Sequence, residues 1–290
     1  MIITLENTLL KVEIKSKGAE LCSIFKKDIG LEYMWSGNPA VWGKTSPVLF
    51  PIVGTLKDNS YLYNGEPYTL PRHGFARDVE FEIMEQKQQK ASFVLKDSEA
   101  SFTNYPFHFE LILTYELESD LLKASYEVRN TGTDNMYFSL GAHPAFKVPL
   151  IDSTAYEDYY LKLDHVENAG RWPITKEGLI QQNPISFLNN SSRIELSRTL
   201  FQDDALVFKH LESHKISLVT DLNAHGLEFY FEGFPYLGLW AAKGGDFICI
   251  EPWCGIADSV DHDQQLVHKE GIEMLPAGNT WRRNWKVRFF

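Results

Sequence analysis

The sequence predicts an all-β fold, a single large antiparallel β-sandwich with many strands. Three observations support this prediction. Period-2 alternation of apolar and polar residues recurs along the chain, turn residues separate the alternating segments, and helical periodicity is hard to find. The regular strand–helix alternation of (β/α)₈ barrels and dinucleotide-binding folds is absent. No Pro/Ser-rich linker, charge block or internal repeat interrupts the 290 residues, so we expect residues 1–290 to form one domain.

The alternating segments give the expected strands in chain order. Residues 9–15 alternate apolar and charged side chains, as a half-buried strand does. Residues 61–70 predict a hairpin, because Asn64-Gly65 supplies the positive φ angles of a tight turn. Residues 107–118 and 121–128 predict a long strand pair, and a turn at 130–132 follows it. Further strands are expected at 215–220, 226–231, 236–240 and 247–250, each bounded by Gly, Asn or Asp, and the best candidate for a helical turn lies at 38–42.

The composition supports a folded core and argues against some partners. Hydrophobic residues make up 44% of the chain and aromatic residues 13%, which is enough for a sizeable core and argues against disorder. The net charge of −11 argues against a nucleic-acid partner, because phosphate neutralisation needs clustered Lys and Arg. It also makes anionic polymers poor substrates, although a local cationic pocket could still hold one phosphate.

The N-terminus and the cysteines bear on the compartment. Residues 1–6 lack the basic-then-apolar pattern of a signal peptide, and no apolar run approaches the roughly 20 residues of a membrane helix. The three cysteines, Cys22, Cys249 and Cys254, are odd in number and have no CxxC spacing, so neither a disulfide framework nor a zinc knuckle is indicated. We expect buried or half-buried thiols, a cytoplasmic location and no membrane partner. A monomer and a homodimer both remain open.

Three short runs combine an ionisable group with Gly or Pro and with aromatic neighbours. They are Ile250-Glu251-Pro252-Trp253, the run 71–78 around His73, and the run 141–146 around His143. A base, an acid and flat apolar surfaces are what a site that moves protons on a sugar requires. The three runs therefore predict acid–base chemistry on a sugar.

Each of the three ionisable groups has a structural alternative. Glu251 is expected between the buried strand 247–250 and a Pro-Trp turn, where desolvation would raise its pKa and make it a better base, but it could be an exposed strand-end carboxylate. His73 and His143 follow strand-like segments and precede Gly or Pro. One could donate a proton while the other orients the substrate, or either could be a structural hydrogen-bonding residue. The other histidines receive no role.

Other kinds of site find less support in the sequence. His73, His143 and Glu251 could form a two-His, one-carboxylate metal set, but no HExxH or HxH spacing accompanies them, and we expect no catalytic metal. Residues 243–246 predict a turn rather than a phosphate loop, and no GxSxG nucleophile elbow occurs. Of the nearby aromatic residues, about half are expected to line a pocket and the rest to be core; they are Trp240, Trp253, Phe75 and Phe146.

At these residues the chain resembles the aldose 1-epimerase (galactose mutarotase-like) family, and especially its LacX-type subgroup. The resemblance extends over nearly the whole chain, and several motifs occur in the same order. These are Phe50-Pro51-Ile52-Val53-Gly54 followed by Leu56-Lys57-Asp58, residues 70–78 around His73, Gly141-Ala142-His143-Pro144, Asp203-Asp204-Ala205-Leu206-Val207-Phe208, and residues 234–240 leading into Glu251-Pro252-Trp253.

The resemblance implies a fold and an activity. The fold would be the galactose mutarotase-like supersandwich, with the sugar site on one concave face. The activity would be interconversion of the α and β anomers of an aldohexose without any cofactor. Glu251 would remove the C1 hydroxyl proton, His143 would protonate the ring oxygen, and His73 would hydrogen-bond the sugar. The substrate-binding residues would be Asp204 (with Asp203 as an alternative), Arg77, Arg72, Trp240 and Trp253.

Two positions depart from the family pattern and leave the substrate open. Thr55 stands where related sequences often have a basic residue, and Arg72 precedes His73 where a Gln is common. Arg77 matches a basic position that faces the substrate in the branch acting on hexose 6-phosphates. Three hypotheses follow: an epimerase on free aldohexoses, an epimerase on a hexose 6-phosphate held by Arg72, Arg77 and Lys57, and a non-catalytic sugar-binding protein. A hydrolase is disfavoured, because glycosidases usually employ two carboxylates and only one stands out.

Overall fold

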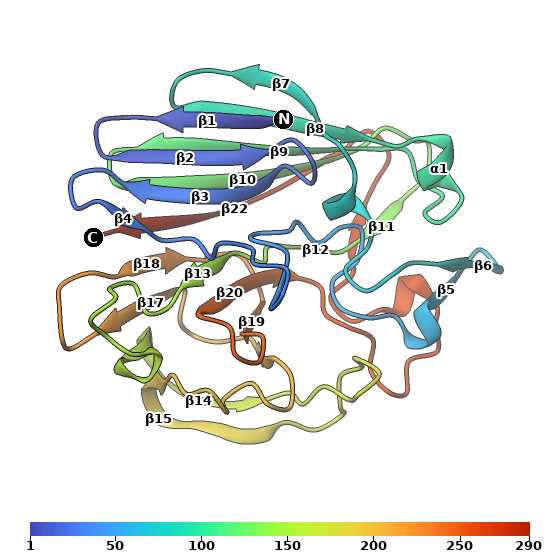
Figure 1. Cartoon of the computed structure of the whole chain (residues 1–290). Coiled ribbons are helices and arrows are strands. Elements are labelled where there is room, and N and C mark those ends of the chain that lie inside the picture. Colours follow the sequence, from blue (N-terminus) through green and yellow to red (C-terminus); the bar gives the residue numbers. More distant parts are fainter.

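The largest sheet has nine strands, all paired antiparallel, in the order β15-β14-β17-β18-β22-β10-β9-β8-β7 (Figure 1). The structure is a computed structural model and describes residues 1–290. The strands of this sheet are β7 (Glu82–Gln86), β8 (Lys90–Lys96), β9 (Phe109–Glu118), β10 (Leu121–Asn130), β14 (Tyr159–Arg171), β15 (Ile185–Glu195), β17 (Lys215–Thr220), β18 (Leu227–Tyr230) and β22 (Thr280–Phe289).

Four smaller sheets complete the β structure. A five-stranded sheet has the order β12-β20-β19-β16, with β13 also paired to β20, and an N-terminal sheet has the order β1-β2-β3-β4. Two further sheets have two strands each: the β5-β6 hairpin, and β11 paired with β21 from a distant part of the sequence. The bounds are β1 (Ile2–Glu6), β2 (Leu10–Lys15), β3 (Glu20–Lys26), β4 (Leu31–Glu32), β5 (Ser60–Tyr63), β6 (Glu66–Thr69), β11 (Met136–Phe138), β12 (Leu140–Gly141), β13 (Ala145–Lys147), β16 (Leu206–Lys209), β19 (Tyr236–Trp240), β20 (Phe247–Cys254) and β21 (Glu273–Leu275).

Helical structure is limited to single turns. They are α1 (Glu99–Phe102), which was not predicted, and the 3₁₀ turns η1 (Lys57–Asn59), η2 (Ala76–Asp78), η3 (Tyr156–Asp158) and η4 (Leu266–His268). The predicted turn at 38–42 is present, with Val41 N–H and Trp42 N–H both donating to the Asn38 carbonyl. None of these helices is long or apolar enough to cross a membrane. The all-β prediction is confirmed.

The local patterns act as the sequence predicts. Burial alternates along β2 and along the whole of β10, so one face of each strand packs inward. In the β5–β6 hairpin, Asn64 has φ 53° and Gly65 has φ 83°, the left-handed values of a tight two-residue turn. β9 and β10 pair in continuous register from Phe109–Asn130 to Glu118–Leu121.

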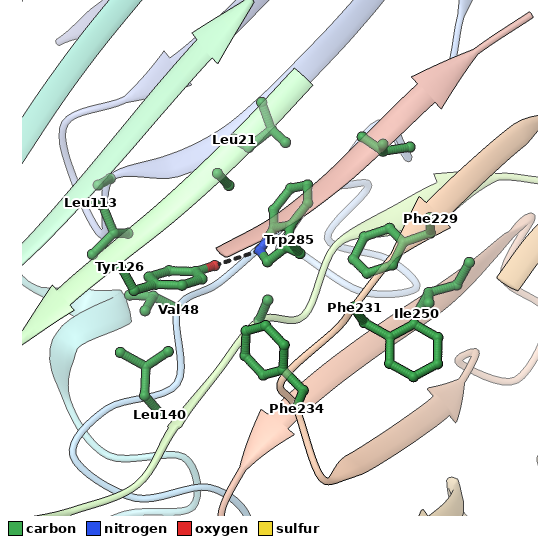
Figure 2. Packing of buried hydrophobic residues seen from close by; sticks show 14 of the residues in the cluster. Leu21, Val48, Leu113, Tyr126, Leu140, Phe229, Phe231, Phe234, Ile250 and Trp285 are labelled. Carbon is green, nitrogen blue, oxygen red and sulfur yellow. Dashed lines mark hydrogen bonds between the residues drawn. The ribbon is translucent and has the colours of Figure 1, made fainter. Parts of the chain in front are cut away.

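The main core lies between the sheets and fixes the strand that carries the candidate site. Figure 2 shows Trp285 of β22 against Phe229 of β18, with ring centroids 5.1 Å apart, while its indole N–H donates to the Tyr126 hydroxyl at 2.9 Å. Ile250 of β20 is fully buried in the same cluster. Because the residue next to Glu251 is a core residue, β20 is held in position from below the site.

One predicted boundary was wrong. β20 does not end at Ile250 before a Pro-Trp turn but continues through Glu251, Pro252 and Trp253 to Cys254. A proline inside a paired strand lacks the N–H that the ladder needs. Here the Pro252 carbonyl accepts a hydrogen bond from Ala142 N–H. The nitrogen and carbonyl of one strand residue point to the same side, so the Pro252 nitrogen faces the segment between the end of β12 and the start of β13. The missing donor therefore falls at a natural interruption of the sheet.

Candidate active site

Strand pairing brings the predicted acid and base together. β20 pairs with β19 on one side, where Gly238 lies opposite Glu251, and with β12 and β13 on the other side. His143 lies in the interruption between β12 and β13, and the neighbouring residue Pro144 accepts a hydrogen bond from Ile250 N–H. His143 is thus placed beside Glu251 by backbone pairing on both sides of the interruption.

His143 and Glu251 form a buried contact with spare hydrogen-bonding capacity. His143 Nε2 lies 3.2 Å from Glu251 Oε2, and both residues are more than nine-tenths buried. Their other polar atoms, His143 Nδ1 and Glu251 Oε1, are buried and have no partner in the protein. Buried polar atoms in folded proteins are almost always hydrogen-bonded. These two atoms therefore leave unused hydrogen-bonding capacity at the contact between the two residues.

Burial controls the protonation of this pair. It raises the pKa of the Glu251 carboxyl well above its usual range, although the Arg72 guanidinium opposes that shift. Burial also lowers the pKa of His143 to about 3. Both directions favour the uncharged forms, a carboxylic acid next to a neutral imidazole. At neutral pH we therefore expect the pair to share one titratable proton, which resides mainly on Glu251 and can move to His143 across the 3.2 Å contact.

His73 is held in a strained backbone conformation with its ring fixed. Its φ is 69°, in the left-handed region that non-glycine residues seldom adopt. Gly54 pairs with it twice: Gly54 N–H donates to His73 Nδ1 at 3.1 Å, and His73 N–H donates to the Gly54 carbonyl at 2.8 Å. Because Nδ1 accepts, the proton of the neutral ring must be on Nε2. Burial lowers the pKa of His73, which keeps this neutral form.

The tautomer of His73 determines what the ring can do. Its ring is nearly perpendicular to that of His143, with centroids 5.9 Å apart. The Nε2–H group can donate a hydrogen bond to a ligand, but it has no lone pair for a metal ion. Arg72 Nε lies 3.3 Å from His73 Nε2. If both nitrogens carry a proton, they cannot hydrogen-bond each other. The Arg72 Nε–H and His73 Nε2–H groups can then both donate to one ligand. The two-His, one-carboxylate metal set that the sequence left as a less supported alternative is therefore not favoured at His73.

These groups line a cavity of about 280 Å³. This is near the lower end of the range of about 300–1,000 Å³ for small-molecule sites, which suits a ligand the size of one sugar ring. Every residue predicted for the site lines the cavity: Glu251, His143, His73, Asp204, Arg77, Arg72, Trp240 and Trp253. Of the four aromatic residues considered, Trp240 and Trp253 line it, whereas Phe146 and Phe75 pack in the main core.

The structure also decides between neighbouring candidates. Asp204 lines the cavity, with its carboxylate 3.6 Å from Arg72, whereas Asp203 is exposed and does not. Lys57 does not line the cavity, because its Nζ donates to the His262 carbonyl instead. A phosphate clamp of three cations that includes Lys57 is therefore wrong. Arg77 remains, and its buried Nε has no hydrogen-bond partner.

Sequence analysis missed Trp42. It lines the cavity, stacks on the His143 ring with centroids 5.1 Å apart and a 25° interplanar angle, and meets Trp240 edge to face. The sequence placed Trp42 only in a turn. Its aromatic character beside Pro39 was the available signal, but the contact partner lies about a hundred residues further along the chain.

A buried ion pair supports the opposite wall. Lys269 Nζ lies 2.8 Å from Asp258 Oδ1, and both side chains are completely buried. The Asp258 side chain also accepts a hydrogen bond from Lys57 N–H through Oδ2. Its backbone makes two more: Asp258 N–H donates to the Thr55 carbonyl, and the Asp258 carbonyl accepts from Ile180 N–H. Asp258 thus joins three wall segments, residues 54–57, 178–180 and 256–258. The first of these contains Gly54, which fixes the His73 ring.

The 174–180 segment packs closely onto Thr55. Gly178 has φ +85°, and a Cβ atom there would lie 2.5 Å from Thr55 Oγ1. Only glycine allows both the backbone conformation and the approach. The small Thr55 side chain is what leaves room for this contact, and Gly178, Ile174 and Ile180 form part of the cavity wall as a result.

Comparison with known proteins identifies the family. The sequence pattern of the family described as aldose 1-epimerase matches residues 1–281. The chain belongs to the aldose 1-epimerase family. Its sequence is 33% identical to the chromosomal protein LacX of Lactococcus lactis subsp. lactis, over 99% of both chains.

Solved structures of the family agree with the fold. A galactose mutarotase related enzyme from Lactobacillus acidophilus has a TM-score of 0.96 and 36% identity, covering 100% of this chain and 97% of that chain. A galactose mutarotase-like protein from Lactobacillus casei has a TM-score of 0.94 and 28% identity, with 100% of both chains covered. Membership of the aldose 1-epimerase family supports a sugar epimerase or mutarotase function.

Proposed function

We propose that this chain interconverts the α and β anomers of an aldohexose by opening and closing its ring. The observation that carries the proposal is the buried His143–Glu251 contact of 3.2 Å, with a free polar atom on each residue, at the wall of a cavity sized for one sugar. The C1 hydroxyl and the ring oxygen are bonded to the same carbon. An acid and a base that touch each other can therefore reach both oxygens at once.

The proton transfers balance within the pair. Glu251 takes the proton of the C1 hydroxyl while the bond between C1 and the ring oxygen breaks, and His143 gives its proton to that oxygen. The product is an open-chain aldehyde with a free hydroxyl group. Rotation about the C1–C2 bond presents the other face of the aldehyde, and the same transfers in reverse close the ring. Each turnover returns the pair to its starting state.

Burial favours the step that opens the ring. Opening converts a carboxylate and an imidazolium into a carboxylic acid and a neutral imidazole. The low-polarity surroundings that raise the pKa of Glu251 and lower that of His143 stabilise this neutral pair. The ion pair that begins the reaction differs from the favoured neutral pair only by one proton moved from Glu251 to His143 across the 3.2 Å contact, so no proton from solvent is needed.

The remaining cavity residues suit a neutral polyol. Trp42, Trp240 and Trp253 offer flat surfaces to the C–H faces of the sugar. Asp204 can accept hydrogen bonds from ring hydroxyls, and Arg72 and His73 Nε2–H can donate to them. The site uses only groups that this chain provides.

One observation favours a second candidate, a hexose 6-phosphate. Arg72 and Arg77 both line the cavity, and the buried Arg77 Nε makes no hydrogen bond, although it lies 3.6 Å from Asp78 Oδ2. Two guanidinium groups can hold a phosphate. Against this, the Asp204 carboxylate lies 3.6 Å from Arg72 and would repel a phosphate bound there. We therefore prefer the free aldohexose.

Polarimetry tests the proposal. Freshly dissolved α-glucose and α-galactose should approach anomeric equilibrium faster with the protein than without it. Glu251→Gln and His143→Ala should each reduce this rate by about 10²–10⁴-fold, the usual contribution of one acid or base. Asp203→Asn, an exposed neighbour of the site, is the matched control and should keep full activity.

Two results would change the assignment. Equal decay rates for the wild type, Glu251→Gln and His143→Ala would remove the proposed roles. Sugar binding by a folded wild type without acceleration on any hexose would instead favour a binding protein. The same assay with α-glucose 6-phosphate separates the two substrate candidates, because the preferred substrate has the higher kcat/KM.

A further inference from the structure

Cys249 adds a third metal-ligating group beside the proposed acid and base. It lies two residues before Glu251 in β20, and residues at i and i+2 of a strand face the same side. One ligand atom each of His143, Cys249 and Glu251 lies within 4.8 Å of the other two. All three residues are buried, and the proposed reaction has no use for the thiol.

The spacing of these atoms is close to a tetrahedral metal site. With Zn–S near 2.3 Å and Zn–N and Zn–O near 2.0–2.1 Å, tetrahedral Zn²⁺ sets N and O about 3.3 Å apart and S and N about 3.6 Å apart. His143 Nε2 and Glu251 Oε2 are already 3.2 Å apart. The Cys249 sulfur lies within 4.8 Å of them, so it has to approach by at most about 1.2 Å, a movement that a change of its side-chain torsion can supply.

Access and donor type are also consistent with a cation. His143 and Glu251 line the cavity, so an ion can reach them from it, and Cys249 completes the set from beneath. His143 Nδ1 and Glu251 Oε1 have no protein partners that binding would have to break. The fourth position would face the cavity and a water molecule. Thiolate with imidazole and carboxylate selects soft or borderline ions such as Zn²⁺ over Mg²⁺.

We propose that His143, Cys249 and Glu251 form an inhibitory site for a thiophilic divalent cation, represented by Zn²⁺. Binding removes one proton from the Cys249 thiol and the proton shared by His143 and Glu251, and both protons pass to the buffer. The imidazole and the carboxylate then hold the metal rather than a transferable proton. Inhibition rests on the proposed function, whereas metal binding itself does not.

Metal binding is tested first, without sugar. The purified, metal-free chain is titrated with Zn²⁺ alone against a chromophoric chelator, and thermal unfolding is followed in parallel. We expect one ion per chain and a higher melting temperature, because an ion that binds only the folded state stabilises it. Mg²⁺ should produce neither effect. His143→Ala, which is expected to be inactive, should also lose Zn²⁺ binding. This part of the test measures binding and therefore does not depend on activity.

The thiol is tested by matched variants. Cys249→Ser should keep its mutarotation rate, and the Zn²⁺ concentration for half-inhibition should rise at least tenfold, because a serine hydroxyl is a poor Zn²⁺ ligand. Cys254→Ser is the control: Cys254 is buried in the same strand but contacts the Gly233 carbonyl, and its loss should leave the inhibition unchanged. Cys249→Ala serves if the serine variant does not fold.

Several results would overturn the proposal. One is the absence of Zn²⁺ binding at up to about 100 μM. Another is an equal half-inhibitory concentration for the wild type and the Cys249 variants, which would assign the metal to other groups. A wild type that binds Zn²⁺ through Cys249 but accelerates no sugar would support the metal site and refute the proposed function.

Discussion

The buried Asp258–Lys269 pair allows a quantitative test of how the cavity wall is supported. Replacing Lys269 by Met removes one charge and leaves the Asp258 carboxylate in the interior with Lys57 N–H and His262 as its remaining partners. Both side chains of the pair are completely inaccessible to solvent. Breaking a buried pair in this way costs about 3–5 kcal/mol, because the remaining charge is uncompensated. That is a large part of the total stability of a protein, about 5–15 kcal/mol.

The pKa of Asp258 gives an independent measure of the same interactions. Burial would raise this pKa, but the close contact with His262 and the charge of Lys269 lower it from 3.8 to about 2. A shift of this size corresponds to roughly 2 kcal/mol. Because the folded pKa is below the unfolded one, this stability is present above about pH 4 and is lost as the pH falls toward 2.

Unfolding by heat and by urea measures the change. At about 2 °C per kcal/mol for a chain of this size, Lys269→Met should lower the melting temperature by about 6–10 °C at pH 7.5. Its acid-induced loss of stability between pH 4 and 2 should be shallower than in the wild type. Lys243→Met, at an exposed lysine, is the control and should unfold like the wild type.

The same variant should affect the proposed site. Asp258 holds the segment that contains Gly54, and Gly54 fixes the His73 ring, so a shifted wall should raise KM more than it lowers kcat. The double variant Lys269→Met with Asp258→Asn has no buried charge left and should recover part of the stability. A melting temperature within 2 °C of the wild type for Lys269→Met, or a double variant less stable than the single one, would refute this account of the pair.

Three further predictions concern other cavity residues. Glu251→Gln should raise the melting temperature more at pH 8 than at pH 5. Burial raises the pKa of the Glu251 carboxyl, so above pH 4.5 the unfolded chain releases a proton that the folded chain retains, and this destabilises the wild type. An equal shift of melting temperature at both pH values would contradict this. Asp204→Asn should raise KM for the preferred hexose about tenfold, whereas Asp203→Asn should not change it; equal effects in steady-state polarimetry would remove Asp204 from sugar binding. Gly178→Val should lower the free energy of unfolding in urea by about 1–3 kcal/mol. The valine Cβ would lie 2.5 Å from Thr55 Oγ1, and the backbone φ at this position is positive. Unchanged stability would show that the 174–180 segment adapts.

Most of the fold could be predicted because its signals are local. Alternation of side chains sets strand faces, and the Asn64-Gly65 pair sets a hairpin, without knowledge of distant contacts. The end of β20 could not be predicted in the same way. Pro252 ordinarily argues against a continuing strand, and only the tertiary pairing shows that its nitrogen falls at the interruption between β12 and β13.

The sequence predicted most of the residues that line the candidate site, but not all of them. Glu251, His143 and His73 stood out because each is an ionisable group among Gly, Pro and aromatic residues. The choice of Asp204 over Asp203 depends on which side chain turns inward, and adjacent identical residues carry no signal for that. The Asp258–Lys269 pair gave no signal either, since charged residues between turns usually face solvent. Only the folded arrangement reveals that they are buried.

The way in which His143 and Glu251 are positioned has a consequence for how new specificities could arise. Their spacing follows from hydrogen-bonded neighbours in adjacent strands of one sheet. Other parts of the cavity wall belong to separate connecting segments at 71–77, 174–180 and 201–205. Under the proposed function, exchange of those connections would alter which hexose is accepted and leave the geometry of the His143–Glu251 pair intact. The protein is thus a scaffold on which selectivity can be engineered, or can diverge in evolution, separately from the reaction.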